Sequence, residues 1–184
     1  MALRPFPLPI RIGTDICHIP RIAYLLTPHS SPSSLRSHRL TRFVTRLLHP
    51  IEAAHFWNRY RRAVEEVPDP GDRDAGARAW TSRFLAGRWA AKEAAIKALG
   101  YRPPHAFHQI VLYSAPTAAD GTSVAPRLIV LDEVNFTRKG NAGWEDRKDA
   151  LGGMEGQEGL VSISHDGEYA TAVVVMPVVV EGAG

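Results

Sequence analysis

Alternation of apolar and polar residues predicts five strands in this chain. Residues 10–16 alternate strictly and are rich in β-branched side chains, which is typical of a half-buried strand. Later segments rich in Val, Ile and Leu, separated by turn residues, predict strands at 109–114, 127–131, 160–164 and 169–176. Between the last two, Asp166 and Gly167 suit a tight hairpin.

In the middle of the chain, apolar residues recur at the spacing of a helix. Between residues 35 and 60 apolar positions recur every three or four residues and Pro50 interrupts them, so we expect two short helices. Residues 83–99 contain six alanines and few helix breakers, and Gly100 follows where a helix end favours a left-handed residue. We expect this long helix to begin at Thr81 or Ser82, since either residue can cap it.

Two segments show neither the alternation of a strand nor the spacing of a helix. Residues 65–79 mix prolines, glycines and charges, and residues 139–159 hold six glycines and no β-branched side chain. We expect both to be exposed loop insertions. The predicted fold is therefore α+β, a single domain over residues 1–184 in which one long helix packs on an antiparallel sheet.

Composition restricts the classes of function. The 184 residues are 45% hydrophobic, and a formal net charge of +3 is too small and too dispersed to mark a nucleic-acid binder. A polyanionic small molecule or an acidic protein would suit this charge equally well. The longest apolar run, near 169–180, is interrupted by Pro177 and is too short for a membrane span. A single cysteine, Cys17, excludes an intrachain disulfide and favours a reducing compartment.

Four side chains in three short strings have candidate chemistry. Glu93 and Lys97 lie four residues apart in the long helix and share a face, where the simplest interpretation is a surface ion pair. Asp15 lies near the end of the first strand and His165 precedes the hairpin, and each is also common as an ordinary turn residue. Together they resemble a divalent-metal and phosphate site, because Mg²⁺ takes few protein oxygens and completes its shell with water and phosphate.

The order of three motifs resembles the 4'-phosphopantetheinyl transferases, and in particular the small holo-acyl-carrier-protein synthase branch. The motifs are GTDI at 13–16, FLAGRWAAKEAAIKALG at 84–100, and VSISH at 161–165 followed by EYA at 168–170. The middle motif is long enough to be specific, and the other two support it. The extra length relative to compact bacterial forms resembles eukaryotic, fungal-like mitochondrial members.

The resemblance implies a reaction, in which the phosphopantetheine group of coenzyme A is transferred to a serine of an apo acyl-carrier protein. The products are holo carrier protein, used in fatty acid biosynthesis, and 3',5'-ADP. By position, Asp15 and Glu93 would ligate Mg²⁺, and Glu93, directly or through a metal-bound water, would help to remove the serine proton. Lys97 would contact the phosphate near the bond that breaks.

Other matching positions would contact the two substrates. Ser164 and His165 would approach the coenzyme A phosphates, and Arg88 would hold a phosphate unless it is only a helix-surface arginine. Arg21 would face the acidic carrier protein. That partner also suits the basic helical stretch with Arg36, Arg39, Arg42 and Arg46, although solvated basic helix faces are common.

The resemblance further implies a homotrimer with active sites between neighbours, without membrane or nucleic-acid partners. The acid-free start before Asp15 fits either a weak organellar address or a plain N-terminal arm, so we expect the mitochondrial matrix, with the cytoplasm as alternative. A non-catalytic protein of the same fold that binds coenzyme A or a carrier protein stays an alternative. A nucleotide hydrolase lacks support, because the sequence has no Gly-x-x-x-x-Gly-Lys-Ser/Thr loop.

Overall fold

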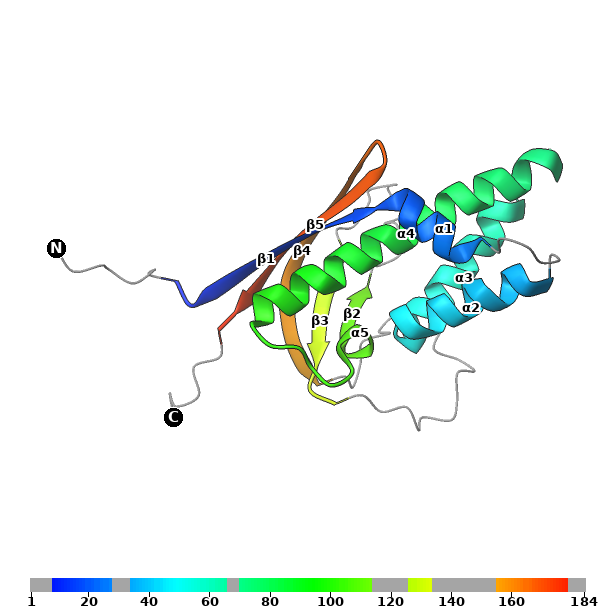
Figure 1. Ribbon diagram of the computed structural model, residues 1–184. Helices are drawn as coiled ribbons and strands as arrows, with labels where there is room; N and C mark the ends of the chain where they lie inside the picture. The colour runs from blue at the N-terminus through cyan, green and yellow to red at the C-terminus, as the bar shows by residue number, and fades with distance from the viewer. Residues whose placement is uncertain (1–7, 28–33, 66–69, 114–125, 134–154, 179–184) are drawn as a thin grey trace, which may run out of the picture.

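The computed structural model describes residues 8–27, 34–65, 70–113, 126–133 and 155–178. These residues form a sheet layer covered on one side by helices, which confirms the α+β prediction (Figure 1). The antiparallel sheet has the strand order β1-β5-β4-β3-β2, with β1 (Ile10–His18), β2 (Ile110–Tyr113), β3 (Arg127–Leu131), β4 (Gly156–Asp166) and β5 (Tyr169–Pro177). The helices are α1 (Ile19–Leu26), α2 (Ser34–Leu47), α3 (Pro50–Glu65), α4 (Pro70–Leu99) and α5 (Ala106–Gln109).

The five predicted strands and the hairpin are confirmed. In the hairpin Asp166 pairs with Tyr169, and Gly167, with φ of 51°, stands first in a two-residue turn. A glycine at that position suits the right-handed twist of the flanking strands. β1 runs on to His18, so Asp15 lies inside the strand rather than near its end.

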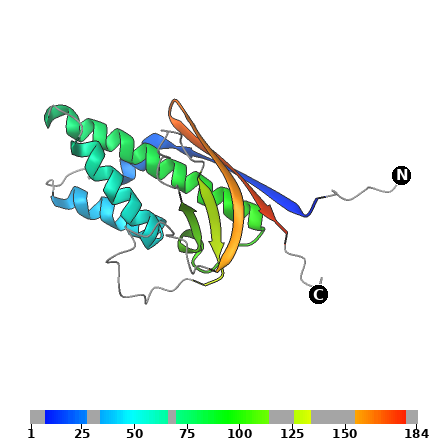
Figure 2. The same ribbon diagram turned by 180° about the vertical axis from the view of Figure 1, so that it is seen from behind.

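The helix α4 crosses the sheet at close range (Figures 1 and 2). Small side chains make this approach possible, because a Cβ at Gly13 of β1 would collide with the carbonyl oxygen of Ala94 in α4. The contact fixes β1 against the C-terminal half of the helix and brings Asp15 to it. The alanines of the same stretch of helix are fully buried, namely Ala86, Ala90, Ala91, Ala94, Ala95 and Ala98.

The expected loop at 65–79 is wrong for residues 70–79, which are the first part of α4. The helix begins at Pro70, where a missing N–H costs nothing because the first turn has no partner for it. The expected start at Thr81 or Ser82 is also wrong, because both residues lie inside α4. The Ser82 hydroxyl donates a hydrogen bond within the helix to the Arg78 carbonyl at 2.9 Å. Tertiary packing outweighs the local signals, since Trp80 stacks on Phe56 of α3 with ring centroids 5.6 Å apart.

The expected loop at 139–159 is wrong at its end, where residues 156–159 pair with β3 as the first part of β4. The two glycines there fit tight spaces: a Cβ at Gly156 would collide with the Val130 carbonyl, and one at Gly159 with the sulfur of Met176. Residues 134–154 lie outside the described residues, as does the N-terminal lead over 1–7. Among the described helices, none is both long and apolar enough to cross a membrane.

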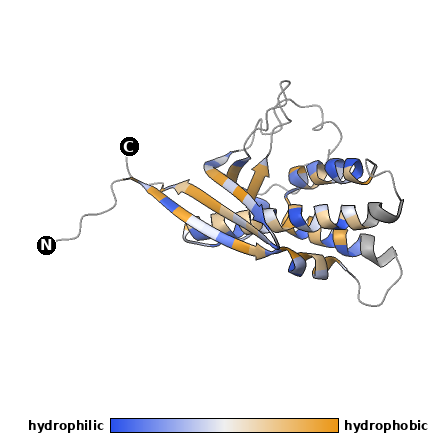
Figure 3. Ribbon diagram, turned by 90° about the horizontal axis from the view of Figure 1, so that it is seen from above, coloured by the Kyte–Doolittle hydropathy of each residue, from blue (hydrophilic) through white to orange (hydrophobic). Residues whose placement is uncertain are grey.

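The face of the sheet opposite the helices carries exposed apolar side chains. Ile12 and Ile16 of β1 are 61% and 63% exposed, and Leu160 of β4 and Val173 of β5 are 72% and 44% exposed. The strand pairings place all four on one face, because Ile12 pairs with Val175, which also pairs with Leu160. Figure 3 shows hydrophobic and hydrophilic stretches following one another along strands of the sheet. A group of exposed apolar side chains on one face is typical of a surface that another protein covers.

Candidate active site at the crossing of β1 and α4

Asp15 and Lys97 form an ion pair where β1 crosses α4. The Lys97 ammonium lies 2.8 Å from Oδ1 of Asp15 and donates a second hydrogen bond, also of 2.8 Å, to the Thr14 carbonyl. Side chains on a helix lean towards its N-terminus, which directs Lys97 back to the strand. The sequence therefore identified both residues, but the surface pair of Glu93 with Lys97 is wrong, because Lys97 reaches the strand instead.

Glu93 lies one turn before Lys97 and faces a different cation. Its Oε1 is 3.7 Å from Nη1 of Arg102, a residue just beyond the end of α4. The side chain is 23% exposed, and that of Asp15 is 18% exposed, so both carboxylates border solvent. Among the described residues, Asp15 pairs with Lys97 and Glu93 faces Arg102.

These two carboxylates fit a magnesium ion by the chemistry of their donors. Carboxylate oxygens are hard ligands, and Mg²⁺ needs only one or two from the protein when a substrate phosphate supplies others. In the described part of the chain, His, Cys, Asp and Glu side chains gather in no group of three or more that would enclose a metal alone. The residues therefore suit an ion shared with a phosphate rather than a fully protein-bound one.

His165 lies against α4, on the inner side of β4. Its Nε2 donates to the carbonyl of Arg83 at 3.0 Å, and its ring would contact any Cβ placed at Gly87. The interpretation of His165 as a solvated turn residue is thus wrong. Ser164 precedes it in the strand and points to the opposite, exposed face of the sheet. The two side chains therefore lie on opposite faces of the sheet.

Arg88 is buried, in contrast to the interpretation that it is a helix-surface arginine. Only 6% of the residue is exposed, and its guanidinium lies 4.9 Å from the centroid of the Phe84 ring. Burial lowers the pKa of Arg88, while the nearby carboxylate of Glu52 raises it. It is not a helix-surface arginine, and a phosphate contact would require a substrate to enter the interior.

Arg21 is exposed on α1, directly beside the motif helix. Its guanidinium lies 5.7 Å from the ring centroid of Trp89 in α4. Trp89 in turn stacks against Phe43 of α2 and contacts Phe107 of α5, with centroid separations of 6.1 and 5.2 Å. These contacts place Arg21 on the surface one helical turn from Glu93.

Sequence reasoning missed a buried ion pair behind the site. The Lys92 ammonium lies 2.5 Å from Oε2 of Glu52 and donates to the carbonyls of Phe107 and Ile110 at 2.5 and 2.6 Å. Burial lowers the pKa of Lys92, and the adjacent Glu52 carboxylate opposes that shift. The pair joins α4 to α3, α5 and β2. Its only sequence signal is that Lys92 stands between the alanines of an otherwise apolar helix face.

Glu52 also caps α3 together with His49. The Glu52 carboxylate accepts the backbone N–H of His49 at 3.0 Å, and Nδ1 of His49 accepts the N–H of Ile51 at 3.4 Å. This is a capping box with histidine in the usual serine or threonine place. Burial, together with charge repulsion from Lys92 and His108, lowers the pKa of His49 to about 4. The ring is neutral at pH 7, as its acceptor role requires.

The chain is similar to known proteins over most of its length. It is 33% identical over 178 residues to "4'-phosphopantetheinyl transferase B, mitochondrial" of Aspergillus fumigatus, which covers 95% of this chain and 98% of that relative. It is 30% identical over 166 residues to the mitochondrial holo-acyl-carrier-protein synthase of Eremothecium gossypii, covering 89% of this chain and 76% of the relative.

Among solved structures, one similar chain is the Bacillus anthracis holo-acyl-carrier-protein synthase in complex with coenzyme A (3',5'-ADP). It is 22% identical, with a TM-score of 0.44, and the match covers 91% of this chain and 95% of that one. The family model for the 4'-phosphopantetheinyl transferase superfamily matches residues 11–124, more than half of the sequence. This chain therefore belongs to the 4'-phosphopantetheinyl transferase superfamily.

Proposed function

We propose that the protein is a holo-acyl-carrier-protein synthase, which transfers the 4'-phosphopantetheine group of coenzyme A to a serine of an apo acyl-carrier protein. The observation that carries this proposal is the placement of Asp15 and Lys97 in contact, with Glu93 one turn away, in a chain that belongs to this enzyme family. A non-catalytic binding protein would have no use for two solvent-bordering carboxylates and a lysine at one point.

In the reaction the serine hydroxyl oxygen attacks the phosphorus that carries the pantetheine arm. A new P–O bond forms, the bond from that phosphorus to the bridging oxygen breaks, and 3',5'-ADP leaves. Glu93, whose side chain is 23% exposed, takes the serine proton. Lys97 lies at the same crossing and stabilises the negative charge that develops on the phosphate oxygens and the leaving group.

Asp15 and Glu93 would hold Mg²⁺, which would neutralise the diphosphate charge and orient it. The two carboxylates each have a cationic side chain nearby, because Lys97 pairs with Asp15 and Arg102 faces Glu93.

The positions of His165 and Ser164 favour a site shared between protomers. Gly87, against which His165 packs, precedes Glu93 by six residues, or about 9 Å along the helix, a span that a nucleotide diphosphate can bridge. Ser164 points away from this helix and would contact a coenzyme A molecule bound to a neighbouring protomer. A homotrimer that covers the apolar sheet face with Ile16, Leu160 and Val173 meets both requirements.

The carrier protein would meet Arg21, whose exposed guanidinium stands beside Trp89. Its acidic surface complements the net charge of +3 of this chain. We further propose the mitochondrial matrix as the location, because relatives from Aspergillus fumigatus and Eremothecium gossypii are named mitochondrial.

The experiment is a transfer assay with coenzyme A, Mg²⁺ and apo acyl-carrier protein, read out by the intact mass of the carrier. We expect a gain of one phosphopantetheine group and equimolar 3',5'-ADP. A carrier whose mass stays unchanged, across several carrier proteins, would reject the transferase and favour the non-catalytic binding protein.

A further inference from the structure

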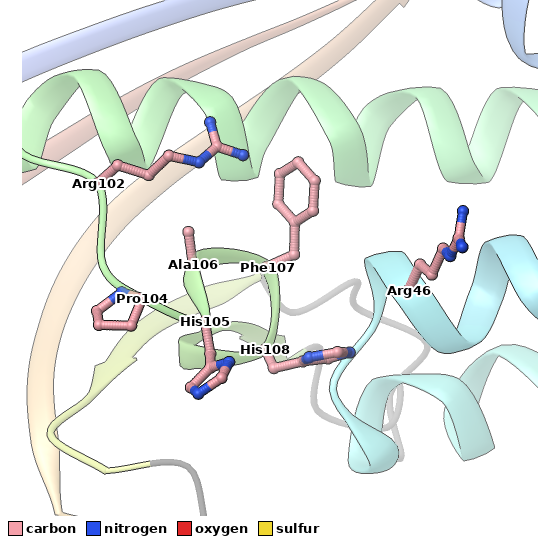
Figure 4. Close-up of a pocket in the computed structure, with 7 residues that line it drawn as sticks. All are labelled: Arg46, Arg102, Pro104, His105, Ala106, Phe107 and His108. Atoms are coloured by element: carbon pink, nitrogen blue, oxygen red, sulfur yellow. The ribbon is translucent and has the colours of Figure 1, made fainter.

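A small basic pocket lies next to Glu93, between the C-terminal part of α2 and the segment that leads from α4 into α5 (Figure 4). Its volume is about 240 Å³, which is more than a carboxylate or phosphate group needs. Among the described residues, no acidic side chain lines it. Its polar lining consists of two arginines and two histidines, namely Arg46, Arg102, His105 and His108.

Arg102 links this pocket to the proposed active site. Its guanidinium stacks 5.3 Å from the ring centroid of Phe107 and lies 3.7 Å from Oε1 of Glu93. Phe107 contacts Trp89, and Arg21 lies on the far side of Trp89. Two cations therefore flank a pair of aromatic rings, with Glu93 beside them.

The wall of the pocket is held by hydrogen bonds. Nε2 of His108 donates to the Thr45 carbonyl at 2.8 Å, which joins α5 to α2 at the position next to Arg46. The buried Lys92 ammonium binds the carbonyl of Phe107 from behind. In Figure 4 the His108 ring points towards α2 and the Phe107 ring towards α4. The pocket is thus a fixed feature of the fold, and Arg46 stands at its exposed rim.

We propose that this pocket receives a carboxylate side chain of the acyl-carrier protein, as a second anchor on the opposite side of Trp89 from Arg21. The proposal rests on the proposed function and deepens it. Two separated cations on an open surface complement several carboxylates on one acidic protein. The phosphates of coenzyme A, in contrast, have Lys97 and His165 on the sheet side of α4.

The test compares steady-state constants for Arg46→Glu and for a matched control, Arg62→Glu. Arg62 is also an exposed arginine on a helix, but it does not line the pocket, so both variants change the net charge equally. For Arg46→Glu we expect the KM for carrier protein to rise about tenfold while the KM for coenzyme A stays within about twofold. The control should change neither constant by more than about twofold.

Three results would overturn the proposal. In the first, Arg46→Glu raises the KM for coenzyme A and leaves the KM for carrier protein unchanged, which would assign the pocket to a phosphate. In the second, Arg46→Glu changes neither KM. In the third, the control Arg62→Glu raises the KM for carrier protein as much as Arg46→Glu does. If Arg46→Glu fails to fold, which its melting temperature reports, Arg46→Gln tests the same contact with an expected rise of about threefold.

A separate measurement distinguishes failure of this inference from failure of the proposed function. Calorimetric binding of an apo carrier protein with its acceptor serine replaced by alanine needs no turnover. Tight binding to the wild type that weakens about tenfold in Arg46→Glu supports the pocket even if no transfer occurs. Equal binding by both proteins overturns the pocket while the transferase assay still stands on its own.

Discussion

The ion pair of Lys97 with Asp15 joins α4 to β1 at the proposed active site. At 55% and 18% side-chain exposure, it is too solvated to contribute more than about 1 kcal/mol to stability. The small gain in stability therefore does not explain why Lys97 and Asp15 lie in contact. Binding of a phosphate and a metal ion would require an ammonium group and a carboxylate close together. The same reasoning applies to Glu93 and Arg102, whose closest atoms are 3.7 Å apart.

Glu93→Gln tests the catalytic role of that carboxylate. The amide keeps the size of the side chain but cannot accept the serine proton, so we expect kcat to fall about 100-fold or more. The metal-free melting temperature should stay level or rise, because little ion-pair energy is lost. Glu158→Gln removes a more exposed carboxylate, 53% against 23% for Glu93, that pairs with Arg127 at 2.6 Å, and it serves as control. A near-normal kcat in Glu93→Gln would withdraw both its metal and its proton-transfer role.

Lys97→Ala tests the phosphate contact. If Lys97 contacts the phosphate as proposed, the variant loses the cation that stabilises it, so we expect kcat to fall about 10-fold or more. Excess Mg²⁺ should not restore the rate, since Asp15 and Glu93 are unchanged. Titration of Mg²⁺ at saturating coenzyme A measures this, and full recovery at high Mg²⁺ would show that Lys97 acts only through the metal site.

At the scale of elements, the buried Lys92 and Glu52 join four segments behind the site. Removing one partner leaves the other charge without compensation in the interior, so Lys92→Met should cost about 3–5 kcal/mol in the free energy of unfolding. The double variant Lys92→Met with Glu52→Gln should recover part of this loss, because no charge then stays buried alone. Urea unfolding of the three proteins measures it. A loss below about 1 kcal/mol in Lys92→Met would contradict the role given to the pair.

The cap of α3 makes stability depend on pH. The pKa of His49 is about 4 in the folded protein against 6.5 in the unfolded chain, so between these values the unfolded state binds more protons. Stability is fully present above about pH 6.5 and decreases as pH falls towards 4, by up to about 2 kcal/mol between pH 7 and 5.

Melting temperatures at pH 7 and 5 measure this effect, with His49→Asn as the matched variant. Asparagine retains a side-chain acceptor for the cap but does not titrate. We expect a clearly smaller decrease in His49→Asn than in the wild type. Because the pKa of His55 is also lowered to about 4 by burial, part of the decrease should persist in the variant. Identical pH profiles would exclude His49 as a contributor.

At the scale of the whole molecule, the described helices lie on one face of the sheet, and the other face carries the exposed apolar side chains Ile12, Ile16, Leu160 and Val173. Light scattering should give a mass three times 20.2 kDa for the wild type. Leu160→Glu places a charge on the uncovered face, and we expect dissociation to monomers with loss of transfer activity. Leu25→Glu, at an exposed apolar position on α1, should keep the wild-type mass. A wild-type monomer at working concentration would reject the shared site.

The sequence by itself determined the strands, the hairpin and the motif helix, because each has a local period or turn residue that reports its own backbone. It also determined the family, since the motif at 84–100 is contiguous. The two loop predictions were wrong where tertiary contacts outweighed weak local propensity. Trp80 packs on Phe56, and α4 begins at Pro70 rather than near Thr81. Gly159 of β4 fits beneath Met176 of β5, where a larger side chain would collide.

Only the tertiary structure decided which charged groups meet. Asp15 and Lys97 are 82 residues apart in the sequence, and Glu52 and Lys92 are 40 apart, so no helical or strand period relates them. Spacing within α4 places Glu93 and Lys97 on one face, but their partners come from β1 and from the segment beyond the helix. The burial of Arg88 likewise depends on α3, because a side chain's solvent exposure is set by the elements that pack over it.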